Sequence, residues 1–159
     1  MEKKGDDVYV NNKVVKCNVQ VSSTEAIIRT TPEVRKQLKR MNVHRTGTFK
    51  AGGSLFYAYS RRITNFEDVR RAYMKLKIQD AHADDIMCAF SVADEFGEQV
   101  QEVMDDREHG AAPKILNAIT KGGYTNVAVF VVRLFDGVHI GGRRFQVITE
   151  AAEAALKLL

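Results

Sequence analysis

The feature that most restricts the fold of this chain is an apolar run from Thr125 to Leu134, which lies between two groups of glycines. The run is too short to cross a membrane as a helix, and its many β-branched residues favour a strand. Because apolar residues occupy nearly every position instead of alternate positions, we expect this strand to be buried on both faces. The sequence therefore predicts a central strand around which the rest of the chain is arranged.

Two sharp turns are expected directly after this strand. Gly137, Gly141 and Gly142 permit backbone conformations with positive φ that other residues rarely adopt. An alanine-rich helix should then begin near Arg143 and continue to the C-terminus. Its apolar face consists of Phe145, Ile148, Ala152, Ala155 and Leu159.

The N-terminal region predicts a hairpin, a helix and a linker. Val8 to Val21 alternates around Asn11-Asn12, a pattern that is typical of a hairpin. Thr31-Pro32 provides an N-cap followed by proline at the first helical position, and the helix should end near Met41. The segment from Val43 to Gly53 has glycines and polar residues with little periodicity, which favours a linker.

Strand and helix patterns follow one another after Gly53. Thr64 and Glu67 match a capping box at a helix start. The other expected elements are strands at Ser54–Ser60, Ile86–Val92 and Gln99–Met104, an apolar helix stripe of Phe66, Val69, Tyr73 and Leu76, and a helix at Ala111–Lys121. This order predicts an α+β fold, a two-layer sandwich with helices on one side of a mixed sheet.

The length of the chain favours one domain, and the linker pattern places the core domain at residues 51–159, after a basic extension at residues 1–50. The chain has 159 residues, 45% of them hydrophobic, and neither a secretory signal nor a membrane-length apolar window, so we expect a cytoplasmic protein without membrane contact. Residues 1–80 carry 17 Lys+Arg against 8 Asp+Glu, whereas residues 81–159 carry 7 against 12. The basic half suggests an acidic partner, such as RNA, an anionic surface or an acidic protein, or only a solvated surface.

Four segments in order resemble the IMPACT family, including its bacterial YigZ-like members. The longest is RLFDGVHIGGRRF at residues 133–145, which resembles the family's pattern of arginine, aromatic residue, double glycine and a closing Arg-Phe. The segments SLFYA at 54–58, ADDIMCAF at 83–90 and DDREHGAA at 105–112 resemble three further family motifs. Together they cover the chain from about Gly53 to Leu159 and make the resemblance specific.

The resemblance implies both a fold and a function. The fold would contain a left-handed β-α-β crossover like that in the second domain of a small-subunit ribosomal protein, with a hairpin and helix as an N-terminal extension. The function would be non-enzymatic control of translation under stress, by binding the ribosome-associated activator of the amino-acid-starvation kinase so that initiation-factor phosphorylation stays low. Family members are also linked to monomeric actin. The binding residues implied by the motifs are Asp105, Asp106, Glu108, Arg133, Phe135, Gly137, Gly141 and Arg144.

The chain departs from the family at several places. Asp85 stands where the family usually has histidine, and Arg107 and Asp136 stand where it has glycine. A carboxylate in place of an imidazole changes the ligands that a surface centred there would bind. The eukaryotic members also carry an N-terminal RWD domain, which about 50 residues are too few to form, and the bacterial members carry a further C-terminal domain. A fragment or a shortened homologue would fit this pattern.

Two groups of residues could carry chemistry. Asp105, Asp106, Glu108 and His109 could hold a hard cation or act as acids and bases, but carboxylates just before a helix more often cap it. Gly137, Gly141 and Gly142 with Arg143 and Arg144 could bind an anion, although tight turn packing is the simpler interpretation. Arg133 should pair with a carboxylate, for which Asp105, Asp106 and Glu108 are the candidates.

Two other functions remain open beside the regulatory one. RNA or ribosome binding would use the basic helix face of Arg35, Lys36, Lys39 and Arg40 together with Arg143 and Arg144. A metal-dependent phosphate-ester enzyme would use the acidic segment. Because no nucleophile motif accompanies the scattered histidines and the two cysteines, we expect no catalytic residue, no cofactor and no metal.

Overall fold

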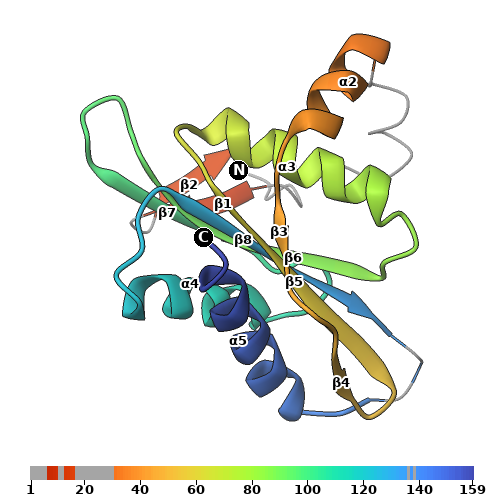
Figure 1. Ribbon diagram of the computed structural model, residues 1–159. Helices are drawn as coiled ribbons and strands as arrows, with labels where there is room; N and C mark the ends of the chain where they lie inside the picture. Colours follow the sequence, from red (N-terminus) through yellow and green to blue (C-terminus); the bar gives the residue numbers. More distant parts are fainter. Residues whose placement is uncertain (1–6, 11–12, 17–30, 136, 138) are drawn as a thin grey trace.

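The computed structural model describes residues 7–10, 13–16, 31–135, 137 and 139–159. Their elements form a sheet with helices on both sides (Figure 1). In chain order they are β1 (Asp7–Val10), β2 (Lys13–Lys16), α2 (Pro32–Arg40), β3 (His44–Arg45), β4 (Phe49–Ala51), β5 (Ser54–Arg62), α3 (Phe66–Gln79), β6 (Asp85–Ala93), β7 (Gln99–Met104), α4 (Ala111–Lys121), β8 (Val127–Leu134) and α5 (Arg143–Leu156). Among these described helices, none combines the length and the apolar character needed to cross a bilayer.

The apolar run forms the central strand, β8, as predicted. The main sheet has the order β3-β5-β8-β6-β7, with β4 also paired to β5. Phe130 in the middle of β8 lies opposite Tyr59 of β5 on one side and Cys88 of β6 on the other. Every residue from Val127 to Val132 has an exposed fraction of 0%. The strand is therefore buried on both faces because the sheet has a hydrophobic core on each side.

The α+β class is confirmed, but neighbouring strands of the main sheet are antiparallel throughout rather than mixed. The reason is that β8 returns between β5 and β6. β5 and β6 are connected through α3 and are parallel to each other. They do not pair, because β8 lies between them and is antiparallel to both. The order of elements along the sequence contains no signal for this insertion.

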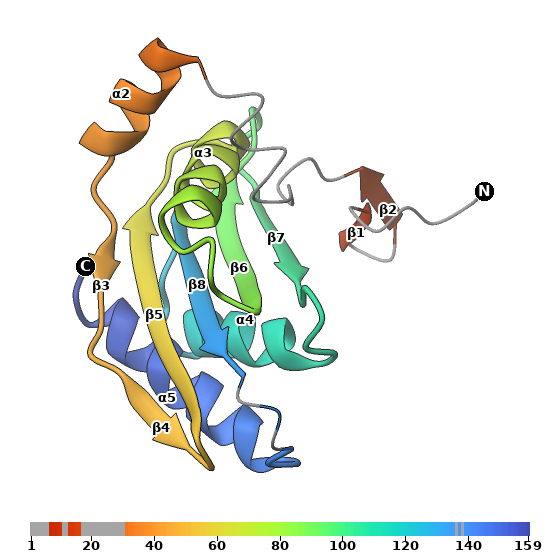
Figure 2. The ribbon, with the colours of Figure 1, turned by 90° about the vertical axis from the view of Figure 1, so that its right-hand side faces the viewer.

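Helices cover both faces of the sheet, not one face as the element order predicts. On one face, Val69, Tyr73 and Leu76 of α3 pack in a cluster with Tyr59 and Phe130. The other face packs against α4 and α5 through apolar residues that include Ile115, Ile119, Ile148, Ala151 and Ala152. The sheet with α4 and α5 corresponds to the predicted two layers, and α3 forms a third layer (Figure 2).

Two crossovers connect parallel strands, β5–α3–β6 and β7–α4–β8, and each spans one intervening strand. In the second crossover the strands point the opposite way, and the chain also moves across the sheet in the opposite direction. Together these two reversals leave the hand of a crossover unchanged, as long as its helix lies on the same face of the sheet. Because α3 and α4 cover opposite faces, the crossovers must then have opposite hands. In Figure 2, β5 and β6 point upward, β6 lies to the right of β5 and α3 lies in front, which is the right-handed arrangement. The β7–α4–β8 crossover is therefore the left-handed one implied by the resemblance.

The N-terminal helix agrees with its prediction, and the linker does not. Thr31 caps α2 by accepting a hydrogen bond from the Val34 N–H at 3.2 Å, with Pro32 as the first helical residue. β1 and β2 pair antiparallel with Val10 opposite Lys13, which confirms the strands of the hairpin, while Asn11, Asn12 and residues 17–21 lie outside the described residues.

Instead of a linker, the segment from Val43 to Gly53 contains β3 and β4, which both pair with β5. Thr46 fixes the segment between them, because its Oγ1 accepts from the Ala58 N–H at 3.0 Å and its own N–H donates to the Ala58 carbonyl at 2.9 Å. Strands of two and three residues are too short to show periodicity, so the pairing is visible only in three dimensions.

The cap of α3 lies one residue later than predicted. Asn65 is the N-cap and accepts from the Asp68 N–H at 2.9 Å. Asp68 in turn accepts from the N–H and the hydroxyl of Thr64, both at 2.8 Å. The reciprocal carboxylate is therefore Asp68 and not Glu67, which forms exposed ion pairs with Arg70 and Arg71.

Glu102 on β7 is a buried carboxylate, only 3% exposed. Its Oε2 has no hydrogen-bond partner in the described part of the chain. Burial alone raises the pKa of Glu102 to about 7, because desolvation disfavours the charged form.

We expect Glu102→Gln to stabilise the protein at pH 8 by roughly 2 kcal/mol and to have little effect at pH 5. A carboxyl group with a raised pKa binds its proton more tightly in the folded state, so the stability that it contributes falls as pH rises from its ordinary pKa toward 7. Urea unfolding at both pH values measures this effect. The exposed Glu95→Gln is the control, and an equal gain at pH 5 and pH 8 would contradict the prediction.

Candidate functional site

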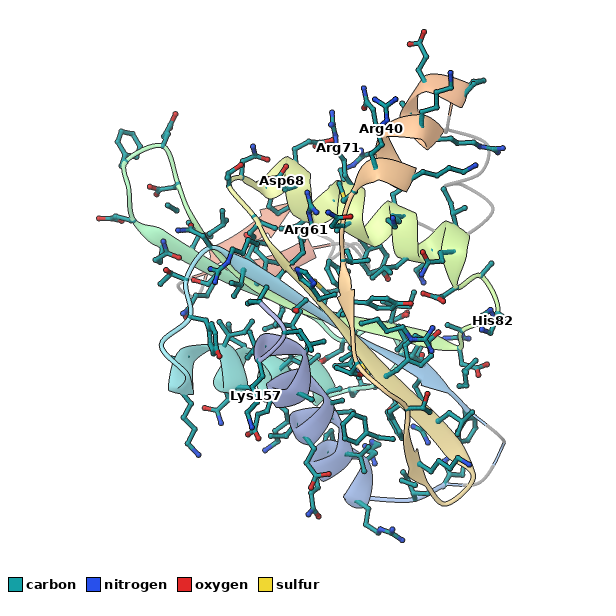
Figure 3. All side chains as sticks on the ribbon, viewed as in Figure 1. Arg40, Arg61, Asp68, Arg71, His82 and Lys157 are labelled. Carbon is teal, nitrogen blue, oxygen red and sulfur yellow. The ribbon has the colours of Figure 1, made fainter. Side chains whose placement is uncertain are left out.

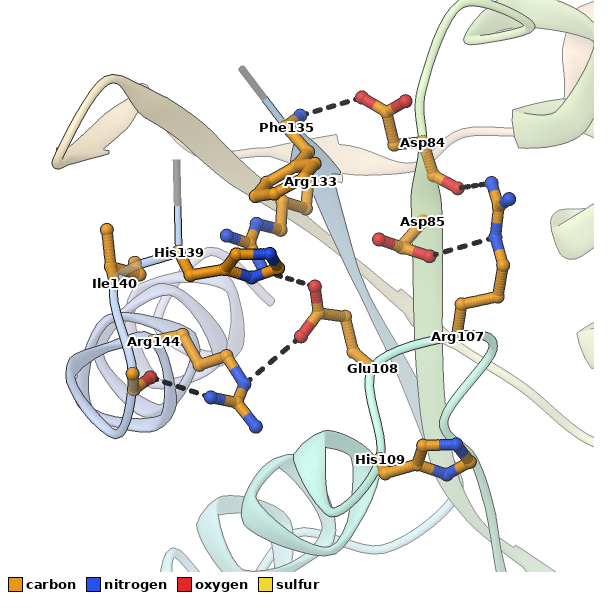
Figure 4. Close-up of a pocket in the computed structure, with 11 residues that line it drawn as sticks. Asp84, Asp85, Arg107, Glu108, His109, Arg133, Phe135, His139, Ile140 and Arg144 are labelled. Carbon is orange, nitrogen blue, oxygen red and sulfur yellow. Dashed lines mark hydrogen bonds and ion pairs between the residues drawn. The ribbon is translucent and has the colours of Figure 1, made fainter. Parts of the chain in front are cut away.

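A cleft with a volume of about 440 Å³ opens where β8 ends and β6 begins. Its walls come from the start of β6, the loop before α4, the end of β8 and the residues that lead into α5 (Figure 4). Five residues of the family motif line this cleft: Glu108, Arg133, Phe135, Gly141 and Arg144. Motif segments that are far apart in sequence therefore converge on one site.

Arg133 is the most buried charge in this cleft, with an exposed fraction of 4%. It forms an ion pair with Glu108, as expected for one of the three candidate carboxylates. It also donates to the Ser54 hydroxyl at 3.2 Å. Its guanidinium lies 5.3 Å from the ring centroid of Phe56 and 4.6 Å from that of Phe135. The two aromatic rings therefore contact the guanidinium beside the Glu108 carboxylate.

Glu108 joins Arg133 to the start of α5. Its second oxygen lies 3.2 Å from Nε of Arg144, and Arg144 also donates to the Gly141 carbonyl at 2.7 Å. A protein carboxylate therefore occupies the position that an external anion would take between the two arginines. At Arg144 a carboxylate of the protein itself lies where a bound anion was one possibility, whereas Arg143 is exposed.

The acidic segment divides its side chains between separate tasks. Asp105 caps α4 by accepting from the N–H groups of Gly110 at 3.0 Å and Ala112 at 2.7 Å, which agrees with the capping interpretation. Asp106 accepts from the Ile86 N–H at 2.8 Å and lies 3.6 Å from Nζ of Lys77. Within the described residues, no three His, Cys, Asp or Glu side chains are grouped so as to hold a metal ion.

Asp85 and Arg107, two departures from the family pattern, contact each other. Nε of Arg107 lies 3.5 Å from Oδ1 of Asp85, and Arg107 also donates to the Asp84 carbonyl at 2.7 Å. The pKa of Asp85 is raised to about 6, first by burial and then by the neighbouring Asp106 and Glu108, while Arg107 and Arg133 offset part of this rise. The two side chains therefore form an ion pair at the cleft wall.

Several lining residues were not among the sequence candidates. Asp84 accepts from the Phe135 N–H at 2.7 Å and so fixes the chain where it leaves β8. His139 stacks obliquely on Phe135, with ring centroids 5.3 Å apart. In the sequence, the pair of aspartates at positions 84 and 85, just before an expected strand, could have indicated Asp84 as a site residue. His139 carries no signal of its own, because its position depends on the turn.

The other predicted residues lie outside the cleft. Gly137 adopts a φ of 91°, as its turn requires, and Asp136 lies outside the described residues. The exposed basic residues of α2, which are Arg35, Lys36, Lys39 and Arg40, lie at the opposite end of the molecule from the start of α5 (Figures 1 and 2). The two basic groups therefore do not form one continuous surface for RNA, and RNA binding by either group stays a prediction.

We expect Glu108→Ala to lower the free energy of unfolding by about 3–5 kcal/mol, because it leaves Arg133 buried without a counter-charge. Chemical denaturation measures the loss. Glu67→Ala, which breaks only exposed ion pairs, should cost at most about 1 kcal/mol. In a double-mutant cycle, Arg133→Met should recover part of the loss; additive effects of the two changes would refute the pairing as a source of stability.

Arg107→Ala should raise the pKa of Asp85 above its value of about 6, because the nearby cation that lowers it is removed. Carbon-detected NMR titration of the Asp85 carboxyl group measures this directly. Arg143→Ala, an exposed arginine outside the cleft, is the matched control. An unchanged or lower pKa in Arg107→Ala would show that the two residues do not interact in solution.

Comparison with known proteins agrees with the motifs. Residues 52–156 match the family model described as the Impact N-terminal domain. The Protein IMPACT homolog of Schizosaccharomyces pombe is 36% identical over 109 residues, which are 66% of this chain and 38% of that protein. The Saccharomyces cerevisiae homolog is 33% identical over 107 residues, 65% of this chain and 42% of that protein. The chain thus spans about two fifths of the length of these curated relatives.

Two solved structures match this chain, and the first of them has a similar fold. The crystal structure of a hypothetical protein matches with a TM-score of 0.61 and 16% identity, covering 74% of this chain and 61% of that chain. The two-domain translational regulator Yih1 matches with a TM-score of 0.49 and 28% identity, covering 94% of this chain and 55% of that chain. The family model extends over well over half of the chain, and its matched segment contains every residue that lines the cleft. This chain belongs to the IMPACT family.

Proposed function

We propose that this chain regulates translation by binding a protein partner through the cleft, and that the partner is the ribosome-associated activator of the amino-acid-starvation kinase. Bound in this way, the activator would fail to switch the kinase on, and initiation-factor phosphorylation would stay low. Membership of the IMPACT family supports the role. The observation that carries the choice of surface is the convergence of five family-motif residues on one cleft.

The contacts inside the cleft favour binding over catalysis. The carboxylate of Glu108 is shared between Arg133 and Arg144, so it is not available to take a proton or to ligate a metal. Asp105 and Asp106 are engaged by backbone N–H groups. These polar groups fix the shape of the cleft. The side chain of Arg107 is also held by Asp85 and the Asp84 carbonyl, but it is 77% exposed at the rim, where a partner can contact it.

The proposal extends to the setting in which the domain acts. We place it in the cytoplasm, in association with ribosomes, where the activator would be met during stress. Monomeric actin is the second partner that we propose, because members of the family are linked to it. Actin and the activator would then compete for this domain. Competition would make translational control respond to the supply of free actin.

A pull-down with the activator tests the proposal. We expect the full chain to retain the activator at physiological salt and Arg107→Glu to bind it about tenfold more weakly, because the substitution reverses a charge on the rim. Arg62→Glu, an exposed arginine on β5 outside the cleft, should bind as the unchanged chain does.

Each outcome of the pull-down has one meaning. Absence of retention by the unchanged chain would remove the activator as the partner. Equal retention by the Arg107→Glu and Arg62→Glu variants would show that the activator binds outside the cleft. The same comparison with monomeric actin decides the second partner separately.

A further inference from the structure

A second hollow, which we call the α2–α3 groove, lies between the basic N-terminal helix and the helix that covers one face of the sheet. Its volume is about 610 Å³, within the range of roughly 300–1,000 Å³ that is usual for binding pockets. The lining residues are Arg35, Leu38 and Lys39 of α2 and Lys75, Ile78 and Gln79 of α3. Each helix therefore contributes three residues at the spacing i, i+3, i+4, which places them on one face.

The groove combines an apolar floor with a cationic rim. Leu38 and Ile78 provide the floor, and both belong to the core on the α3 side of the sheet. Arg35 and Lys39 are exposed on the rim and form no ion pair with any described carboxylate. Two further exposed cations, Lys36 and Arg40, lie on the same helix. The charge on this rim is therefore available to a partner.

Lys75 holds the two walls together and defines the groove. Its ammonium group donates to the carbonyl of Leu38 at 2.9 Å and to that of Met41 at 2.7 Å, at the C-terminal end of α2. The Leu38 carbonyl also accepts from the Met41 N–H at 3.2 Å, so Lys75 adds a second donor to it and donates to the Met41 carbonyl just after the helix. The two hydrogen bonds anchor the Lys75 side chain between the helices. Burial there, together with the nearby Arg61, lowers the pKa of Lys75.

From these features we infer that the α2–α3 groove binds an acidic amphipathic helix of a partner protein. The charge of the rim selects acidic side chains, and the floor requires apolar side chains between them. Both walls are helices with backbone groups that are already hydrogen-bonded, so no strand edge is present to accept an extended peptide. The partner must therefore satisfy its own backbone, as a helix does.

The same features argue against single-stranded nucleic acid as the occupant. Proteins that bind it without sequence preference combine cations with aromatic side chains on which bases stack. None of the six residues that line the groove is aromatic. An apolar floor of leucine and isoleucine would stay uncovered beneath a phosphate backbone. α2 also lies outside the segment that matches the family model, so this inference does not depend on the proposed use of the cleft.

Fluorescence anisotropy with the full chain tests the inference. The probe is a labelled helical peptide with leucine at positions i, i+3 and i+7 and glutamate on the flanking positions. We expect Arg35→Glu/Lys39→Glu to weaken its binding roughly tenfold or more. The matched control is Lys121→Glu/Lys157→Glu, which makes the same change of charge at exposed positions, at the end of α4 and just after α5. Figure 3 shows Lys157 far from Arg40 of α2, and Figure 1 shows α4 away from α2.

Ile78→Ser tests the floor, with circular dichroism to confirm that the variant is folded. If it is not folded, the rim double variant decides alone, since it leaves the core intact. Weakening by the rim and floor variants but not by the control supports the inference. Equal binding of the peptide by all variants, or equally tight binding of polyglutamate or of poly(U) RNA, would overturn it. The cleft variant Arg107→Glu should bind the peptide normally, which separates this result from failure of the proposed function.

Discussion

The ion pair between Arg133 and Glu108 is the interaction on which the arrangement of the site depends. Arg133 lies at the end of the central strand with 4% of its surface exposed. A charge at that depth costs several kcal/mol unless a counter-charge and hydrogen bonds accompany it. Glu108 supplies the charge from the loop before α4, and Ser54 at the start of β5 supplies a hydrogen-bond acceptor. The pair therefore ties together segments from three parts of the chain.

The same pair shapes the electrostatics of the cleft. Through Arg144 the carboxylate of Glu108 also reaches the start of α5, so the wall that follows the glycine turns is held in place. Asp85 lies beside this network, and its raised pKa reflects burial first and the neighbouring carboxylates second. Arg107 offsets part of that effect. The carboxylate of Asp85 is thus accompanied by the guanidinium of Arg107.

The two binding surfaces that we propose differ in chemistry. The cleft lies at one end of the sheet and is built from segments inside the family match. The α2–α3 groove lies against the opposite core and needs α2, which precedes that match. One domain could then engage two partners, or two parts of one partner.

The sequence by itself determined the local elements and the burial of the central strand. Its periodicity, prolines and glycines predicted the bounds of β7 and α4, the cap at Thr31, and the start of α5, because these depend on neighbouring residues. Only the tertiary structure decided the insertion of β8 between β5 and β6, the pairing of the Val43–Gly53 segment with β5, and the contact between Asp85 and Arg107. Each of these joins residues that are distant in sequence, and their free energy comes from burial and pairing that exist only in the folded chain.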